Sequence, residues 1–159
     1  MKVYRIEREK YLDSVLKGTG AALKDGFRWN SINTRLVYTA ESRALAMLEV
    51  SVHLDLNEDF PSDRYYVEID IPGDTGILEL PAVELPGGWD SKPPVKETQF
   101  IGDEFVRDKL AAVLRVPSSI VPKEFNYLIN PDHPDAKKIK VTSKVPILFD
   151  QRLKKARTK

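Results

Sequence analysis

The segment that decides the fold runs from Phe27 to Leu54 and reads FRWNSINTRLVYTAESRALAMLEVSVHL. A turn rich in Asn and Ser leads into a short branched, apolar run at 36–39, which predicts a strand. The run at 44–54 is apolar on most sides and predicts a helix at the centre of the fold. We expect Thr39 to cap this helix, because a hydroxyl can accept a bond from a backbone N–H two or three residues on.

Glu49 is the anomaly of that helix. At 100° per residue it shares a face with three apolar residues, Leu45, Leu48 and Val52. A charge on an apolar face is costly unless another group pairs with it or uses it. The residues alone leave two interpretations open: a buried ion pair with Arg28 or Arg5, or a catalytic carboxylate.

The flanking sequence predicts an α+β fold. Alternating or branched apolar runs predict further strands at 2–6, 64–71, 77–80, 126–129 and 140–149, the last as an edge strand because of Pro146. The stretch 114–122 is predicted as a strand that ends in a polar turn. Short helices are expected at 9–16 and at 102–112, the second capped by Asp103. The stretch 72–94 is a long irregular excursion, and 59–63 is a loop. Regular βαβ units and Gly-rich phosphate loops are missing, which argues against a Rossmann or P-loop fold.

Composition narrows the function classes. The 159 residues suit one domain, 1–159, with a core of its own. There is no cysteine and there are two histidines, which excludes thiolate chemistry and argues against a metal site. The 25 basic and 24 acidic residues give no overall charge that would attract nucleic acid or a membrane surface. Without a signal-peptide core or a span of about 20 apolar residues, we expect a cytoplasmic protein.

A set of polar side chains at predicted strand ends and turns could bind a phosphorylated sugar: Arg5, Arg28, Tyr38, Glu49, Ser118 and Asn126. Arginine clamps a diphosphate through its planar fork, and Trp29 or Tyr38 can stack on a base. A carboxylate can bond ribose hydroxyls and stabilise a developing oxocarbenium ion. Each has a structural alternative: Tyr38 as a core aromatic, and the serine and asparagine as turn formers.

The order of several short motifs resembles the RES-domain family, toxins of bacterial toxin–antitoxin pairs. The matching segments are VYRI at 3–6, RWN at 28–30, LVYTAES at 36–42, ALAMLEVSVHL at 44–54, VPSSIVP at 116–122, NYLINPDHP at 126–134 and FDQRL at 149–153. They run nearly end to end in the family's order. No single motif is very specific, but the ordered set is.

The resemblance implies an ADP-ribosyltransferase-like fold of mixed sheets with a central helix. It implies an enzyme that depletes NAD by breaking the nicotinamide–ribose bond, with water or inorganic phosphate as acceptor and with no metal. Arg28, Tyr38 and Glu49 would be catalytic, and the NAD-binding set would be Arg5, Trp29, Asn30, Ser118 and Asn126, with Ser119 as an alternative to Ser118.

The resemblance also implies a partner, an Xre-type antitoxin that covers the pocket, and a homodimer within that complex. Three other functions remain open from the sequence. The chain could be a transferase that modifies a macromolecule, an RNase toxin, or a nucleotide-binding module without catalysis.

Overall fold

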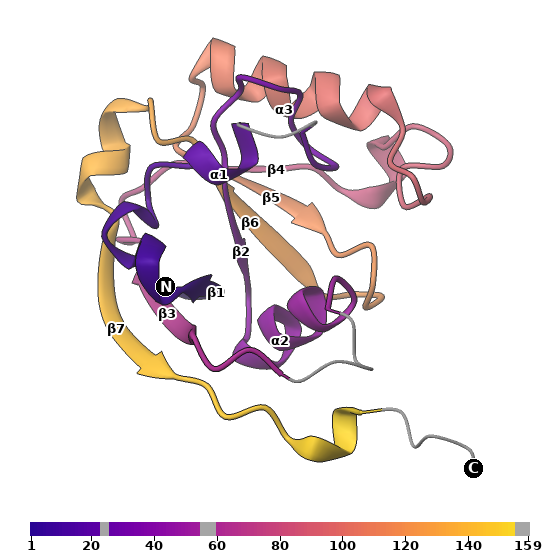
Figure 1. The fold of residues 1–159 in the computed structure, drawn as a ribbon. Coiled ribbons are helices and arrows are strands. Elements are labelled where there is room, and N and C mark those ends of the chain that lie inside the picture. Colours follow the sequence, from indigo (N-terminus) through magenta and orange to yellow (C-terminus); the bar gives the residue numbers. More distant parts are fainter. Residues whose placement is uncertain (23–25, 55–59, 155–159) are drawn as a thin grey trace.

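The computed structural model describes residues 1–22, 26–54 and 60–154. Seven strands form one mixed sheet in the order β4-β5-β6-β2-β1-β3-β7, in which β4 and β5 are parallel and the other neighbours are antiparallel (Figure 1). The strands are β1 (Lys2–Arg8), β2 (Val37–Ala40), β3 (Arg64–Asp70), β4 (Ile77–Glu79), β5 (Val113–Pro117), β6 (Phe125–Ile129) and β7 (Lys140–Pro146).

The helices are few and mostly short. The α-helices are α1 (Thr19–Ala22), α2 (Arg43–Ser51) and α3 (Lys96–Asp108). Three 3₁₀ turns lie between strands, η1 (Glu9–Ser14), η2 (Ala82–Glu84) and η3 (Pro134–Lys138), and a fourth, η4 (Gln151–Leu153), follows β7. This content confirms the predicted α+β class. No helix in the described part of the chain is long and apolar enough to cross a bilayer.

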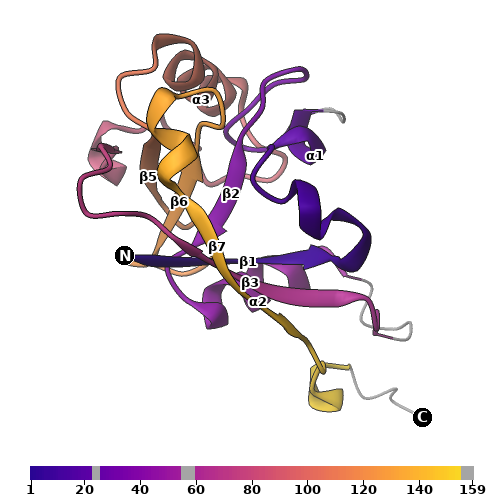
Figure 2. The same cartoon turned by 90° about the vertical axis from the view of Figure 1, so that its left-hand side faces the viewer.

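The sheet consists of two halves that meet at a weak joint. β1 pairs with β3 along its whole length, but it pairs with β2 only at Tyr4 and Ala40. Figure 2 shows β1 and β3 running across the direction of β2 and β6. The β1-β3-β7 half and the β4-β5-β6-β2 half can therefore face different directions, and α2 lies over their joint in contact with β1 and β2.

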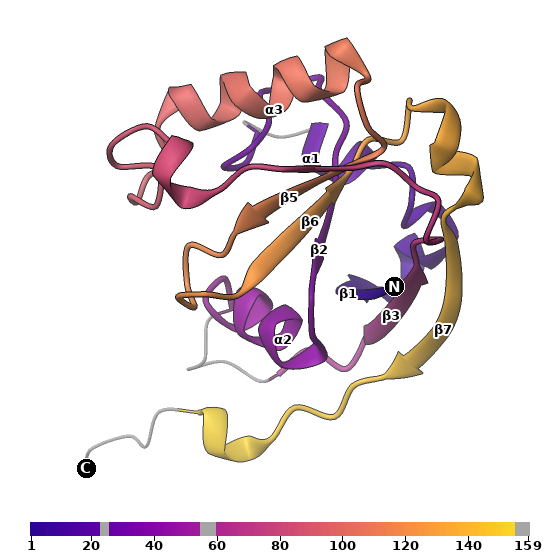
Figure 3. The same cartoon turned by 180° about the vertical axis from the view of Figure 1, so that it is seen from behind.

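Apolar side chains pack on both faces of the sheet. Val3, Val37 and Ile69 belong to a cluster that also takes in Leu12 of η1. On the other face, Leu114 and Leu128 pack with Phe105 of α3, which lies along the β4–β5 side of the sheet (Figure 3). The strand alternation predicted from the sequence thus places one apolar row on each face.

Helix α2 packs on β1 and β2 at one end of the sheet (Figure 1) and is not enclosed, so the predicted position at the centre of the fold was wrong. Leu45 and Ala46 are buried, whereas Leu48 and Val52 are 39% and 43% exposed. Ser42, and not Thr39, caps the helix: its side chain accepts a bond from the Leu45 N–H at 3.0 Å. The Thr39 cap was wrong because the Thr39 hydroxyl, which lies within β2, instead donates to the Tyr127 carbonyl at 2.7 Å.

Helix α3 begins at Lys96 rather than Gly102, and Asp103 lies inside it. The Asp103 carboxylate accepts bonds from the backbone N–H and the hydroxyl of Ser31, so it caps no helix. The predicted start failed because Gly102 suggested a boundary, whereas it is a contact point inside the helix. A Cβ there would stand 1.6 Å from the Trp29 carbonyl oxygen.

The remaining elements lie close to their predicted positions. The strand predictions hold within a few residues, and β7 is an edge strand that ends at Pro146. The predicted helix at 9–16 is the 3₁₀ turn η1. Asp59 of the predicted 59–63 loop lies outside the described residues.

Candidate functional site

Arg28 projects from a tight turn and is held by main-chain carbonyls. The Phe27 N–H donates to the Asn30 carbonyl at 3.0 Å, which closes the turn. The Arg28 Nη1 donates to the carbonyls of Trp89, at 2.5 Å, and Ser91, at 3.1 Å. Burial lowers the pKa of Arg28, and the nearby charges of Asp90 and Glu49 act in the opposite direction. Among the described residues no carboxylate forms an ion pair with it, so its charge is not neutralised by contact.

Tyr38 faces this turn from β2. Its hydroxyl donates to Asn30 Oδ1 at 2.6 Å and accepts from the Trp29 N–H at 3.1 Å. Its ring lies 5.6 Å from the Phe27 ring. Burial raises the pKa of Tyr38 well above the ordinary range of a phenol. Tyr38 is therefore a neutral group whose hydroxyl is already engaged.

Trp29 and Asn30 lie behind Arg28 and Tyr38. Trp29 is 3% exposed and packs near Trp89, with 6.4 Å between ring centroids. Asn30 is fully buried, and its Nδ2 donates to the carbonyls of three residues, Ala21, Ser31 and Thr34. The structure thus places these two predicted NAD-binding residues in the protein interior, where they fix the turn.

Glu49 of α2 lies near Ser118, just after β5, and near Asn126, at the start of β6. Burial raises the pKa of Glu49, while hydrogen bonding by the Asn126 side chain and then the charges of His53 and Arg28 oppose that rise. The Ser118 side chain, near the carboxylate, opposes the rise to the smallest extent. No cation within the described ranges lies in ion-pair contact with it. Glu49 therefore does not form the ion pair with Arg28 or Arg5 that was one of its two interpretations.

Ser118 and Asn126 are held by the backbone of neighbouring segments. The Ser118 hydroxyl oxygen accepts from the N–H groups of Ile120 and Val121, both at 3.1 Å, which leaves its proton free to donate toward Glu49. The Asn126 Nδ2 donates to the Thr39 carbonyl at 3.3 Å. Of the two adjacent serines, Ser118 is the one that interacts with Glu49.

Arg5 lies away from this group. It shares a strand face with Val3 of the core, whereas Tyr4 and Ile6, on the opposite face, pack against the cluster that contains Leu45 of α2. Its guanidinium pairs with Glu7 at 2.6 Å, and burial lowers its pKa. The structure therefore brings together Arg28, Tyr38, Glu49, Ser118 and Asn126, but not Arg5.

A pocket of about 290 Å³ opens beside Ser118. Its lining comes from the 82–90 part of the long excursion and from the 117–123 turn, and includes Trp89, Asp90 and Lys123. Sequence reasoning missed these three residues. The only signal was the length of the excursion, which suggested a functional loop without identifying a residue.

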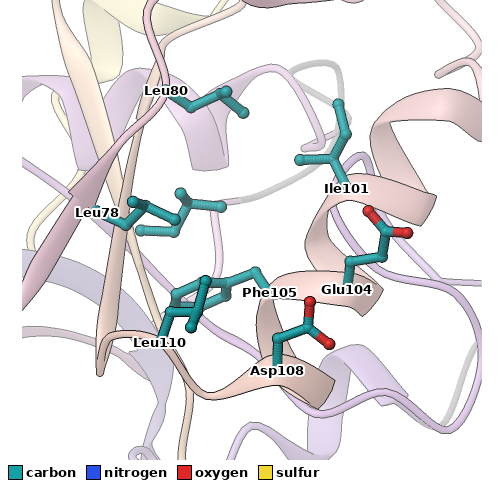
Figure 4. Close-up of a pocket in the computed structure, with 8 residues that line it drawn as sticks. Leu78, Leu80, Ile101, Glu104, Phe105, Asp108 and Leu110 are labelled. Carbon is teal, nitrogen blue, oxygen red and sulfur yellow. The ribbon is translucent and has the colours of Figure 1, made fainter.

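A second pocket, of about 200 Å³, lies between β4 and α3 (Figure 4). Leucine, isoleucine and phenylalanine side chains form its walls, and Glu104 and Asp108 stand at its edge. It contains none of the predicted site residues. In the described ranges, no group of three His, Asp or Glu side chains is arranged to hold a metal ion.

The Tyr38 hydroxyl should support the fold through its two partners. Tyr38→Phe would leave the Asn30 oxygen and the Trp29 N–H without a partner, so we expect a loss of about 1–3 kcal/mol in the free energy of unfolding. Urea unfolding measures this loss. Tyr11→Phe is the control, because Tyr11 is 46% exposed and should unfold like the parent. If both variants unfolded at the same urea concentration, the Tyr38 hydroxyl would not stabilise the fold through Asn30 and Trp29.

Comparison with known proteins gives a consistent result. The RES domain family model matches residues 2–150. The "Prs ADP-ribosylating toxin" of Sphingobium sp. (strain YBL2) is 43% identical over 87% of this chain and 86% of its own length. A "Toxin Res" of Photorhabdus laumondii is 38% identical over 99% of both chains.

A solved structure supports the fold independently. The toxin–antitoxin complex MbcT–MbcA of M. tuberculosis contains a chain that superposes with a TM-score of 0.72 at 18% identity, covering 92% of this chain and 83% of that one. At this identity the likeness speaks for the fold alone. The family match over almost the whole chain and the relatives above 30% identity decide the membership. The chain belongs to the RES-domain family of toxins.

Proposed function

We propose that this protein cleaves the bond between nicotinamide and ribose in NAD and acts as the toxin of a toxin–antitoxin pair. The observation that carries the proposal is Glu49: a partly buried carboxylate near the Ser118 hydroxyl and the Asn126 amide, within electrostatic reach of an arginine whose charge is not neutralised by contact. Such a carboxylate can bond ribose hydroxyls and stabilise the cationic ribosyl transition state.

The other residues take roles that fit their contacts. The Arg28 guanidinium is held by two carbonyls, and its charge would suit the diphosphate of NAD. The Tyr38 hydroxyl is engaged with Asn30 and Trp29, so Tyr38 would pack its ring on the nicotinamide ribose rather than transfer a proton. The nicotinamide ring nitrogen is already positive in NAD, and its departure as a neutral amide needs little acid catalysis.

The acceptor would be water or inorganic phosphate. With water the products are nicotinamide, ADP-ribose and a proton; with phosphate they are nicotinamide and a phosphorylated ADP-ribose. A second function is favoured by the relative named as an ADP-ribosylating toxin: transfer of ADP-ribose to a macromolecule after the same bond is broken. The family name and the solved complex support an antitoxin partner, for which we propose an Xre-type protein that covers the site. We also propose a homodimer within that complex.

Incubation of the purified protein with NAD tests the proposal, with nicotinamide release followed over time and the sugar product identified with and without phosphate. We expect stoichiometric nicotinamide and a sugar product. ADP-ribose attached to a protein or RNA would favour the transferase instead. Degraded RNA with intact NAD would overturn the proposal in favour of an RNase, and thermal protection by NAD without its consumption would indicate a binding module.

A further inference from the structure

The pocket beside Ser118 has walls suited to a nucleoside. Its volume of about 290 Å³ is near the lower end of small-molecule sites, which span roughly 300–1,000 Å³, so it fits one half of a dinucleotide better than the whole. Apolar and aromatic side chains supply most of the lining: Ala82, Trp89, Pro117, Ile120 and Pro122. Such walls favour a planar base, which stacks or packs against them.

Ser118 connects this pocket with the Glu49 group. Its side chain lies near enough to Glu49 to oppose the rise in the pKa of that carboxylate, and the same residue lines the pocket. The lining comes from 82–90 and 117–123, whereas Glu49 belongs to α2. If Glu49 contacts the reacting ribose, the nicotinamide half of NAD lies on the Glu49 side of Ser118. The adenosine half then extends to the other side, into the pocket.

The segment 89–91 places Arg28 next to the same pocket. The carbonyls of Trp89 and Ser91 accept the Arg28 guanidinium, and Asp90, between them, lines the pocket. The negative charge of Asp90 lies near Arg28 and raises the pKa of that guanidinium against the effect of burial. A guanidinium at this position, between the Glu49 group and the pocket, suits the diphosphate that joins the two nucleoside halves.

Resting on the proposed function, we propose that this pocket is the adenosine subsite and that Asp90 reads the adenosine ribose, so that the enzyme selects NAD over NADP. A carboxylate accepts a bond from a ribose 2′-hydroxyl and repels a 2′-phosphate, the principle by which acidic residues select NAD in dinucleotide-binding folds. Lys123, exposed at the rim, has the opposite charge and partly offsets this selection. Asp90 is exposed as well, but the Arg28 bonds fix its backbone on both sides, so we expect its charge to outweigh that of Lys123.

The test compares kcat/KM for NAD and for NADP. We expect the parent enzyme to prefer NAD by more than about 10-fold, because like charges oppose each other at the 2′ position. Asp90→Asn should raise kcat/KM for NADP roughly 10-fold, mainly through KM, and lower that for NAD by about 3-fold. Lys123→Asn should widen the preference, and Asn tolerates the positive φ of 66° at this position.

Glu84→Gln is the matched control. It removes one negative charge from the same excursion, but Glu84 does not line the pocket, so the NAD/NADP ratio should stay at the parent value. An Asp90→Asn ratio equal to that of the parent, or an equal loss for both substrates, would overturn the adenosine subsite while NAD cleavage stands. If the parent consumes no NAD, the proposed function itself fails. Thermal unfolding of each variant confirms that it is folded.

Discussion

Glu49→Gln is expected to lower the kcat of NAD cleavage by about 10²–10³-fold, with a smaller change in KM. Glutamine keeps the shape of the side chain but removes the charge that would oppose the cationic transition state, and groups that act there are typically worth this factor. Initial rates of nicotinamide release measure the effect. Glu104→Gln is the control, because Glu104 lies on α3 with its side chain 64% exposed. Equal rates for Glu49→Gln and the parent would remove Glu49 from the mechanism.

Stability separates a chemical role of Glu49 from a structural one. Burial raises its pKa in the folded state, so the folded protein holds this proton more tightly than the unfolded chain. The carboxyl therefore favours folding below the unfolded pKa, and this contribution is lost as the pH rises through the raised value. We expect Glu49→Gln to be at least as stable as the parent at neutral pH, with that advantage vanishing in acid. A fall in the kcat of a Glu49→Gln variant that is as stable as the parent would then come from the lost catalytic charge and not from unfolding.

Gly102→Ala is expected to destabilise the protein by roughly 3 kcal/mol, although alanine is the better helix former. The added Cβ would stand 1.6 Å from the Trp29 carbonyl oxygen, so α3 and the Phe27–Asn30 turn must move apart. For a chain of this size the melting temperature should fall by roughly 6–12 °C, measured by circular dichroism. Because the same turn carries Arg28, we expect NAD turnover to fall as well.

Gly20→Ala provides the matched comparison within a helix. Gly20 lies in α1, and a Cβ there would meet nothing within 4 Å. Its stability should remain equal to that of the parent or rise by about 0.5–1 kcal/mol, since alanine restricts the unfolded chain. If Gly102→Ala were as harmless as Gly20→Ala, the close contact between α3 and the turn would be refuted.

The strands were predictable because the alternation of apolar and polar residues along each strand reflects which of its faces is buried. Val67, Ile69 and Ile71 alternate with polar residues, and a strand with one buried face requires that pattern. The ends of the helices were harder to predict from the sequence. Ser42 and Thr39 are equally able to cap a helix, and the choice depends on the Tyr127 carbonyl, which lies far along the sequence. Gly102 indicates a helix end unless the packing of Trp29 against it is known.

Some residues of the candidate site could be predicted from the sequence, and others could not. Glu49 attracted notice as a charge among apolar residues, and its proximity to Ser118 and Asn126 follows from a fold that only the family resemblance could suggest. Trp29 and Asn30 were named for the correct turn, but sequence cannot show that both side chains point into the interior. No neighbouring residue in the sequence marks Asp90 as a site residue. It lines the pocket only because the 72–94 segment folds back to Arg28.

The anchoring of Arg28 by carbonyl oxygens has an evolutionary consequence. Main-chain acceptors exist at every residue, so the side chain at position 91 can change among relatives without loss of the bond to Arg28. Selection then acts on the path of the backbone at 89–91 rather than on a sequence motif. Substitutions in this loop can alter the lining of the pocket, and with it the choice of ligand, while the arginine stays in place.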